Sequence, residues 1–449
     1  MEKAMNNPRV TVVGAGLAGS EAAWQLLKRG IPVKMIEMRP EKYSPAHHTG
    51  GFAELVCSNS LKAEHLTNGS GLLKAEMRAL DSLILRAAEQ SRVPAGGALA
   101  VDRDQFSEII TRTLSEHPLC EVERGVVHEI PEEPCIIATG PLTDEGLAAA
   151  IQQLPGMQAL NFFDAAAPIV TLESINMERA FRASRYGRGE GDDYINCPMT
   201  EEEYNAFYDA LVSAELAEVH DFEKKLVFEG CLAVEILASR GRMTLAFGPL
   251  KPVGLVDPHT GKMPFAVVQL RQDNAAGTLF NLVGFQTRLK WGEQKRVFSM
   301  IPGLEKADFA RYGVMHRNTY LKSPEVLQEN FALKGRPLLR FAGQMTGVEG
   351  YMESAASGLV AGVGMAYALM GREEPVFSGK TMMGALMRHT ITPTGNFQPM
   401  NSNFGILEPL GERVRGKKFR YERLSERAIQ EMEQTINDYQ LNADGGNKE

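Results

Sequence analysis

The sequence predicts an α/β protein in which a Rossmann-like domain is interrupted by a smaller α+β insertion. A strand, glycine turn and helix pattern occurs near the start of the chain, over Arg9–Pro40, and a similar pattern occurs near its end, over Pro337–Ala366. Between them the pattern changes to a capped helix followed by several strands. A chain of 449 residues is also long enough for two or three structural units.

The first pattern reads RVTVVGAGLAGSEAAWQLLKRGIPVKMIEMRP. The apolar run Val10–Val13 predicts a buried strand, and the glycines that follow it predict a tight turn. A helix is expected over Ser20–Arg29, where Gly30 ends it, and a second strand over Val33–Ile36. This is the order of elements in which a glycine turn binds a dinucleotide.

The glycines of this turn and the acidic residue after the second strand each have a task at such a site. Gly14 permits the turn, Gly16 lets the backbone approach a pyrophosphate, and Gly19 lets the helix pack on the strand. Glu37 can accept hydrogen bonds from ribose hydroxyls, and helix-terminal N–H groups meet the phosphate charge. We therefore assign these four residues and Ala15 to a dinucleotide site rather than to a chance glycine turn.

Two later segments favour a flavin dinucleotide, FAD. Cys135–Pro141 predicts a short buried strand that ends at a glycine, and Pro337–Ala366 predicts a strand, a glycine-rich turn and a helix. A helix that begins near Glu353 would point its positive end at the pyrimidine side of an isoalloxazine ring. Ordinary strand–helix packing without a ligand is the alternative. The cofactor-binding residues predicted here are Gly140, Gly343, Gln344 and Gly347.

The middle of the chain predicts the insertion. Thr200-x-x-Glu203 is a capping box and predicts the start of a helix. The predicted strands are Lys225–Phe228, Pro264–Leu270 and Thr278–Phe285. The resulting division is a first part of the FAD-binding domain at 1–160, the insertion at 161–334, and a second part with a basic C-terminal region at 335–449.

Composition excludes several classes of protein. The net charge of -8 disfavours indiscriminate binding to nucleic acid, so a site for nucleic acid has to be regional. The start of the chain lacks the charged and apolar regions of a signal peptide, and no apolar run is long enough to span a bilayer. The five cysteines show neither CxxC nor zinc-ligand spacing, which argues against a disulfide framework. We expect no membrane contact and a cytoplasmic location.

Two cysteines are candidates for chemistry. Cys57 lies in FAELVCSNSLKAE, where capping residues predict a helix over Leu61–Glu64 whose N-terminus would lower the pKa of the thiol. A loop thiol that only packs is the alternative. Cys231 follows a predicted strand and a glycine, which fits presentation on a loop and fits a core position equally well. The remaining cysteines are expected to be packing residues: Cys120, Cys135 and Cys197.

Six segments together resemble a known family. They are GAGLAGSEAAW, FAELVCSNSLKAE, VDRDQF, FEGCLAVE, FAGQMTGVEGYMESAASG and NFQPMNSNFG. The chain resembles the bacterial folate- and FAD-dependent tRNA uracil-5-methyltransferases, TrmFO, from about Val10 to Pro409. The segments FAELVCSNS and FEGCLAVE separate it from the related MnmG (GidA) flavoproteins. One departure is Ala233, where the family pattern has a proline.

The resemblance implies an FAD-binding domain of the glutathione-reductase type and a defined reaction. NAD(P)H reduces FAD, methylenetetrahydrofolate supplies a one-carbon unit, and a uridine in the T loop of tRNA receives it. Uracil C5 becomes nucleophilic when a thiolate attacks C6, so the reaction requires a cysteine. By resemblance Cys231 is that nucleophile and Cys57 assists beside the flavin, with a flipped uracil between the two thiols.

A tRNA partner requires basic surface, and Glu412–Arg427 interleaves seven cationic residues with Phe419 and Tyr421. The alternative is a solvated helix face with Glu/Arg pairs, especially over Arg423–Arg427. A second predicted patch on the insertion consists of Arg288, Lys290, Lys295 and Arg296.

Three other functions stay open on the sequence. They are wobble-uridine modification of the MnmG kind, an FAD and NAD(P)H oxidoreductase without an RNA substrate, and an RNA-binding module without chemistry. Candidates for acid or base catalysis, by residue type alone, are His47, His48, His316 and His389.

Overall fold

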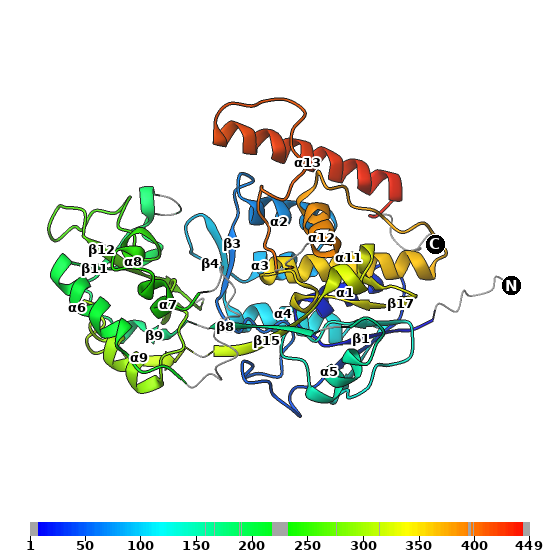
Figure 1. Ribbon diagram of the computed structural model, residues 1–449, viewed down its shortest axis with the longest axis horizontal. Helices are drawn as coiled ribbons and strands as arrows, with labels where there is room; N and C mark the ends of the chain where they lie inside the picture. The colour runs from blue at the N-terminus through cyan, green and yellow to red at the C-terminus, as the bar shows by residue number, and fades with distance from the viewer. Residues whose placement is uncertain are drawn as a thin grey trace.

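The computed structural model describes residues 8–157, 159–165, 167–187, 189, 191–217, 232–274, 276–313, 315–393, 397 and 399–442. For residues 159–165 and 315–319 it describes the backbone alone. The chain forms a larger half built on a parallel sheet and a smaller half built on an antiparallel sheet, side by side in Figure 1.

A six-stranded sheet forms the centre of the larger half, in the order β16-β17-β7-β1-β2-β6. Neighbouring strands run parallel, except that β16 is antiparallel to β17. The strands are β1 (Val10–Val13), β2 (Val33–Glu37), β6 (Cys120–Arg124), β7 (Cys135–Ile137), β16 (Ala332–Leu333) and β17 (Arg336–Phe341). The central strands are apolar without alternation because helices cover both faces of a parallel sheet. The predicted α/β fold class is confirmed.

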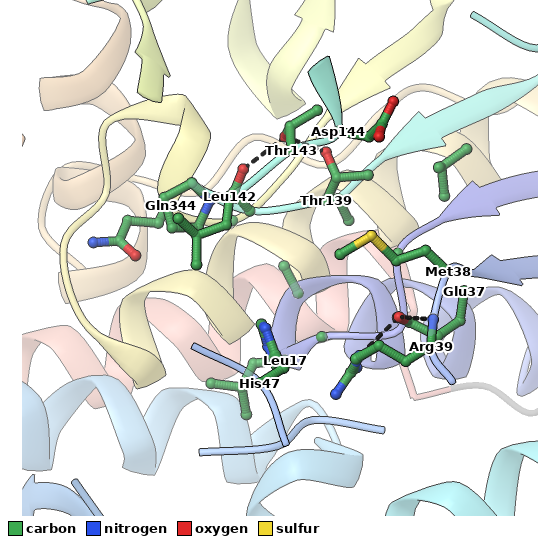
Figure 2. Close-up of a pocket in the computed structure, with 18 of the residues that line it drawn as sticks. Leu17, Glu37, Met38, Arg39, His47, Thr139, Leu142, Thr143, Asp144 and Gln344 are labelled. Atoms are coloured by element: carbon green, nitrogen blue, oxygen red, sulfur yellow. Dashed lines mark hydrogen bonds and ion pairs between the residues drawn. The ribbon is translucent and has the colours of Figure 1, made fainter. Parts of the chain in front are cut away.

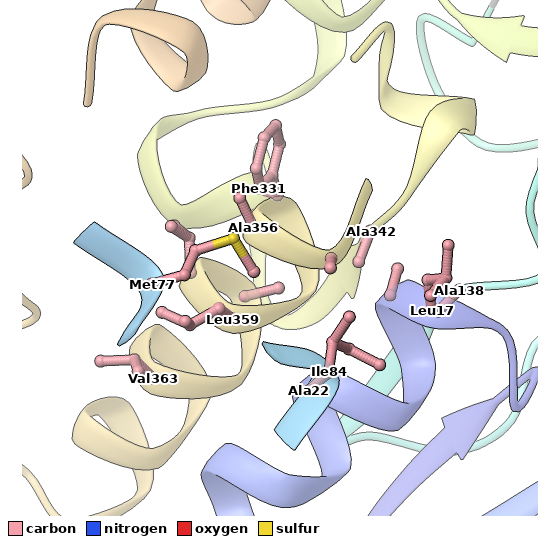
Figure 3. Packing of buried hydrophobic residues seen from close by; sticks show 14 of the residues in the cluster. Leu17, Ala22, Met77, Ile84, Ala138, Phe331, Ala342, Ala356, Leu359 and Val363 are labelled. Carbon is pink, nitrogen blue, oxygen red and sulfur yellow. The ribbon is translucent and has the colours of Figure 1, made fainter. Parts of the chain in front are cut away.

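Helices α1 (Leu17–Leu27) and α11 (Tyr351–Leu369) cross each other in close contact (Figure 3). A Cβ placed on Gly358 would lie 2.1 Å from the carbonyl oxygen of Ala18, and one on Gly362 would lie 2.6 Å from that of Ala22. Only glycine at these positions lets the two backbones approach so closely. None of the helices in the described ranges is long and apolar enough to cross a membrane.

Further elements surround this pair of helices. An antiparallel three-stranded sheet contains β3 (Ser60–Ala63), β5 (Ala98–Val101) and β4 (Arg92–Val93). Asp102 caps the next helix, because its carboxylate accepts from the N–H groups of Asp104 and Gln105. The helices are α2 (Gly69–Ala79), α3 (Leu83–Gln90), α4 (Arg103–Ser115), α5 (Glu145–Gln152), α10 (Ser323–Val326), α12 (Met382–Ile391) and α13 (Lys417–Tyr439), the last lying across the top in Figure 1.

The smaller half is the insertion and has its own apolar core. Its six strands are ordered β10-β11-β12-β13-β9-β14, and every pair of neighbours is antiparallel. The strands are β9 (Ile169–Thr171), β10 (Phe181–Arg182), β11 (Tyr194–Met199), β12 (Ala266–Gln272), β13 (Leu279–Leu282) and β14 (Phe309–Arg311). The helices are α6 (Glu201–Val212), α7 (Val234–Ser239), α8 (Thr244–Phe247) and α9 (Trp291–Phe298). The capping box of Thr200 and Glu203 is present at the start of α6, as predicted.

Two antiparallel strands join the halves. The chain leaves the larger half along β8 (Ala159–Ala165) and returns along β15 (Met315–Leu321), which pairs with β8 over its whole length. The larger core draws on residues 10–151 and 321–441, and the core of the insertion on residues 167–307. On this basis we keep the predicted boundary at 160. The predicted boundary at 334 lies too late, because the larger core resumes at Leu321 and β16 at Ala332–Leu333 belongs to its sheet, so we propose the division 1–160, 161–320 and 321–449.

Some predicted elements differ from those observed. The predicted helix over Leu61–Glu64 is wrong, because Ser60–Ala63 forms strand β3 and pairs with β5. The first helix begins at Leu17 rather than Ser20, since Gly16 itself is its N-cap. The predicted strand Lys225–Phe228 lies outside the residues that the structure describes.

Candidate functional site

A cleft opens at the carboxyl ends of β1, β2 and β7, where ligands bind in open α/β sheets (Figure 2). The N-termini of α1 and α11 also border it. Its open space is about 1060 Å³, including space open to solvent. The predicted cofactor residues that line the cleft are Gly14, Gly16, Glu37, Gly140, Gly343 and Gln344.

The glycines of the first turn have the geometry that a dinucleotide requires. Gly14 has a φ of +95°, and a Cβ there would lie 2.7 Å from the carbonyl oxygen of Ala138. A Cβ on Gly19 would lie 1.8 Å from the carbonyl oxygen of Gly14, so this glycine packs the helix against the turn. A Cβ on Gly16 would meet nothing within 4 Å, because the residue faces the cleft at the start of α1. That open space and the adjacent helix end fit a pyrophosphate.

The carboxylate of Glu37 is fixed at the edge of the cleft. Its Oε2 accepts from the N–H of Ala15 at 2.8 Å, and its Oε1 accepts from the N–H and the Nε of Arg39 at 3.0 and 2.8 Å. Burial would raise the pKa of Glu37, but the hydrogen bonds and charge of Arg39, together with these backbone donors, hold it below its ordinary value. A carboxylate offers about four acceptor positions, so the three donors within the described residues leave room for one more, as a ribose hydroxyl would require.

Three predicted cofactor residues do not line the cleft. Ala15 is fully buried and presents its N–H to Glu37. Gly19 lies behind the turn. Gly347 has a φ of +89°, and a Cβ there would lie 2.5 Å from the ring of Phe397, so its role is to let a loop pack closely.

No sequence motif points to Arg39, which follows Glu37 after one residue and fixes its carboxylate. Its side chain is 2% exposed and also pairs with Glu54 at 3.1 Å. Two threonines of the cleft, Thr139 and Thr143, share a hydrogen bond of 2.6 Å between their hydroxyls. His47, a candidate by residue type alone, does line the cleft, with its Nδ1 2.6 Å from the hydroxyl of Ser44.

The N-terminus of α11 reaches the cleft through Tyr351 and Ser354. The helix begins at Tyr351, close to the predicted start. Glu353 in its first turn is fully buried, and its Oε1 accepts from Ser402 and from the Nζ of Lys62 at 3.0 Å. Burial would raise the pKa of Glu353, but Lys62 and the Ser402 donors hold it below its ordinary value. The first turn therefore carries an ionised carboxylate balanced by a lysine.

Cys57 lies directly beside the cleft. Its neighbours Val56 and Tyr351 line the cleft, although Cys57 itself does not. The N–H groups of Cys57 and Ser58 both donate to the hydroxyl of Tyr351, at 2.7 and 3.1 Å. Because β3 replaces the predicted helix, no helix begins directly after Cys57 to lower the pKa of its thiol.

The other cysteines divide into two groups. Burial raises the pKa of Cys120 to about 11, and it raises those of Cys135 and Cys197 to about 12. These thiols stay protonated at neutral pH, as expected of packing residues. Cys231 lies outside the described residues, so its predicted role stays a prediction.

The basic C-terminal segment is partly neutralised. The ring of Tyr421 stacks on that of Phe404 with centroids 4.1 Å apart, while Phe419 is 64% exposed. Arg423 pairs with Glu412 and Glu426 at 3.5 and 3.2 Å. These pairs are the ones expected if this part of the segment is a solvated helix face rather than a surface for tRNA. The second predicted patch is also paired with carboxylates, through Arg288–Glu235 at 3.7 Å, Lys290–Glu215 at 2.8 Å and Arg296–Glu293 at 2.6 Å.

Comparisons with known proteins give consistent matches. A family model described as Glucose inhibited division protein A (GIDA) matches residues 9–373. A protein of Desulforamulus reducens named methylenetetrahydrofolate--tRNA-(uracil-5-)-methyltransferase TrmFO is 60% identical over 434 residues, which cover 96% of this chain and 98% of that protein. A protein of the same name from Desulfitobacterium hafniense is 60% identical over 427 residues, 95% of this chain and 98% of that protein.

A solved structure supports the fold. The structure of Aquifex aeolicus GidA in its form II crystal matches with a TM-score of 0.69 at 14% identity, covering 98% of this chain and 76% of that chain. At this identity the match shows that the two chains share an architecture.

Proposed function

Because the chain belongs to the TrmFO family, we propose that it is a folate-dependent tRNA (uracil-5-)-methyltransferase that acts on a T-loop uridine. The observation that carries this function is 60% identity to proteins of that name over almost the full length of the chain. The cleft beside Cys57 supplies the physical setting for the reaction. We propose a cytoplasmic location, where tRNA and folate are available.

The residues at the cleft fit FAD. The start of α1 at Gly16 would hold the pyrophosphate, Glu37 a ribose, and the N-terminus of α11 at Tyr351 the pyrimidine edge of the ring. When bound, FAD supplies the redox chemistry between NAD(P)H and the one-carbon unit of methylenetetrahydrofolate. Gly140, Gly343 and Gln344 would close the cleft around it.

The cysteines would act on the uracil. We assign to Cys231 the attack on C6, which places negative charge on the ring and makes C5 nucleophilic towards the incoming carbon. Loss of the C5 proton and departure of the Cys231 thiolate then restore the C5–C6 double bond. Two electrons drawn from NAD(P)H would reduce the transferred methylene to a methyl group as its bond to the carrier breaks. Cys57 would assist from its position beside Tyr351, and the uridine has to leave the T-loop stack to reach either thiol.

Transfer of carbon label from methylenetetrahydrofolate into unmodified tRNA tests the function. The purified protein with FAD and NADPH should form labelled 5-methyluridine in the T loop, and Cys231→Ala should form none. Cys120→Ala is the matched control, because its thiol is unreactive and lies at the start of β6. Absence of label from wild type with FAD bound would contradict the proposal and favour wobble-uridine modification or an oxidoreductase without RNA.

A further inference from the structure

Arginine side chains hold the segment that carries Cys57. Arg103, the first residue of α4, donates to the carbonyl oxygen of Leu55. Arg311, the last residue of β14, donates to the carbonyl oxygen of Val56. The two residues that precede Cys57 are therefore each fixed by a guanidinium group.

A third arginine holds the residues that follow. Arg271 in β12 donates from its Nη2 to the hydroxyl of Ser58 at 2.6 Å and from its Nε to the Oδ1 of Asn59 at 3.1 Å. The hydroxyl of Tyr351 accepts from the backbone of Cys57 and Ser58. We call Arg103, Arg271 and Arg311 the arginine clamp.

The clamp surrounds Cys57 with excess positive charge. All three guanidinium groups are close enough to interact electrostatically with the Cys57 side chain. The carboxylate of Asp273 interacts electrostatically with all three arginines and pairs with Arg103 at 3.0 Å. Burial raises the pKa of Tyr351, with Cys57 adding to the rise, so the phenol stays neutral. The Nε of Arg311 is buried and has no hydrogen-bond acceptor within the described part of the chain.

The clamp is assembled from both halves of the molecule. Arg103 comes from the larger half, whereas Arg271 and Arg311 come from two strands of the insertion sheet. Asn59 strengthens the same junction, since its amide donates to the carbonyl oxygens of Val101 and Gln272 at 3.0 and 2.8 Å. Cys57 therefore belongs to the larger half, whereas two of the three arginines around it belong to the insertion.

We propose that the arginine clamp holds Cys57 as a thiolate at neutral pH and that the insertion, by supplying two of the three guanidinium groups, controls the reactivity of this thiol. Cationic neighbours stabilise a thiolate relative to a thiol. The charge state is independent of the reaction, whereas its use in catalysis rests on the proposed function. Docking of the insertion would then complete the reactive state of Cys57.

Alkylation of Cys57 by iodoacetamide tests this proposal. Its rate is measured in the FAD-bound protein across a range of pH by peptide mass spectrometry. The thiol should titrate below about pH 7, at least about 1.5 units below the ordinary 8.5. Arg311→Met should raise the pKa of the thiol by about one unit and slow alkylation severalfold near pH 6.5, approaching tenfold at lower pH. Arg311→Lys should keep most of the wild-type rate, because it keeps the charge.

Two further variants protect the test against loss of folding. Asp273→Asn removes the negative charge beside the clamp and should speed alkylation near pH 6.5. Partial loss of the clamp structure would instead slow alkylation, so the two effects have opposite signs. Arg242→Met removes an exposed arginine of the insertion that pairs with Asp209, and it should leave the rate unchanged. A wild-type thiol that titrates at about 7 or above, or an Arg311→Met rate equal to wild type, would overturn the proposal. Neither tRNA nor folate is present, so the outcome is independent of the label-transfer assay.

Discussion

Substitution of Glu76 by glutamine tests how the fold tolerates a fully buried carboxyl group. Glu76 lies on α2, and its two oxygens accept from the N–H groups of Met382 and Met383 at 2.7 Å each, in the first turn of α12. No ion pair to Glu76 occurs in the described ranges. Burial raises the pKa of Glu76 from 4.5 to about 8, against the lowering effect of these two backbone donors.

The expected effect on stability follows from the direction of this pKa shift. The folded state binds the proton more tightly than the unfolded state, so the contribution to stability is fully present below about pH 4.5 and is lost as pH rises through about 8. At about 1.4 kcal/mol per pKa unit, the complete loss is about 5 kcal/mol. The glutamine side chain of the variant does not titrate and avoids this loss, although its amide nitrogen leaves one N–H of α12 without an acceptor, at about 1–3 kcal/mol.

Urea denaturation of wild type and Glu76→Gln between about pH 5 and 8 measures the difference. Relative to wild type, the variant should gain about 3–4 kcal/mol in free energy of unfolding over this range. Hydrogen exchange of the α12 amides should show the same trend locally. A difference that stays constant with pH would refute the reasoning, because it would mean that the positive end of α12 keeps Glu76 ionised throughout.

Three further outcomes are expected. Gly358→Ala places a Cβ 2.1 Å from a carbonyl oxygen of α1 and should lower the free energy of unfolding by about 2 kcal/mol, measured by urea denaturation. Glu37→Gln replaces an acceptor oxygen by a donor and should weaken FAD binding about 10- to 100-fold, measured by fluorescence titration. Neutralising Arg415, Lys417 and Lys418 together should weaken tRNA binding and reduce the slope of log affinity against log salt by roughly 2–3, measured by filter binding.

Each of these predictions has a control. Gly292→Ala should leave stability unchanged or raise it by up to about 1 kcal/mol, since Gly292 lies in α9 and a Cβ there meets nothing within 4 Å. Glu123→Gln, on an exposed residue of β6, should leave FAD affinity unchanged. Arg423→Gln should change tRNA binding little, because this arginine is already paired with two glutamates. Equal effects of a control and its test variant would contradict the corresponding assignment.

The dinucleotide turn can be predicted because its signals are local. Gly14, Gly16 and Glu37 lie within a single strand–turn–helix–strand unit, and each has the geometry that its spacing predicts. The predicted helix over Leu61–Glu64 is wrong for the opposite reason. The residues before Leu61 are of the types that cap helices. Lys62 nevertheless has a φ of +64°, and the segment pairs with β5, so tertiary pairing overrides the local preference.

The surroundings of Cys57 could not be predicted from the sequence. Arg271 and Arg311 are more than 200 residues away along the chain, and no local pattern relates either arginine to this thiol. The glycine-rich segment around Gly347 suggests a cofactor contact, whereas the observed contact of Gly347 with Phe397 depends on a distant loop. Local sequence motifs therefore predict the cleft, whereas the positive charge around Cys57 depends on contacts between residues that are far apart in the sequence.

The pairing of β8 with β15 gives the chain a modular construction. Ala159 is opposite Leu321 in the ladder, so the two points where the insertion departs and returns are neighbours. All six strands of the parallel sheet lie outside residues 159–321. A gene shortened at this pair and closed with a tight turn would still encode that sheet in unbroken order. The insertion thus departs from and returns to the larger half at neighbouring points, so the order of that sheet does not depend on what lies between them.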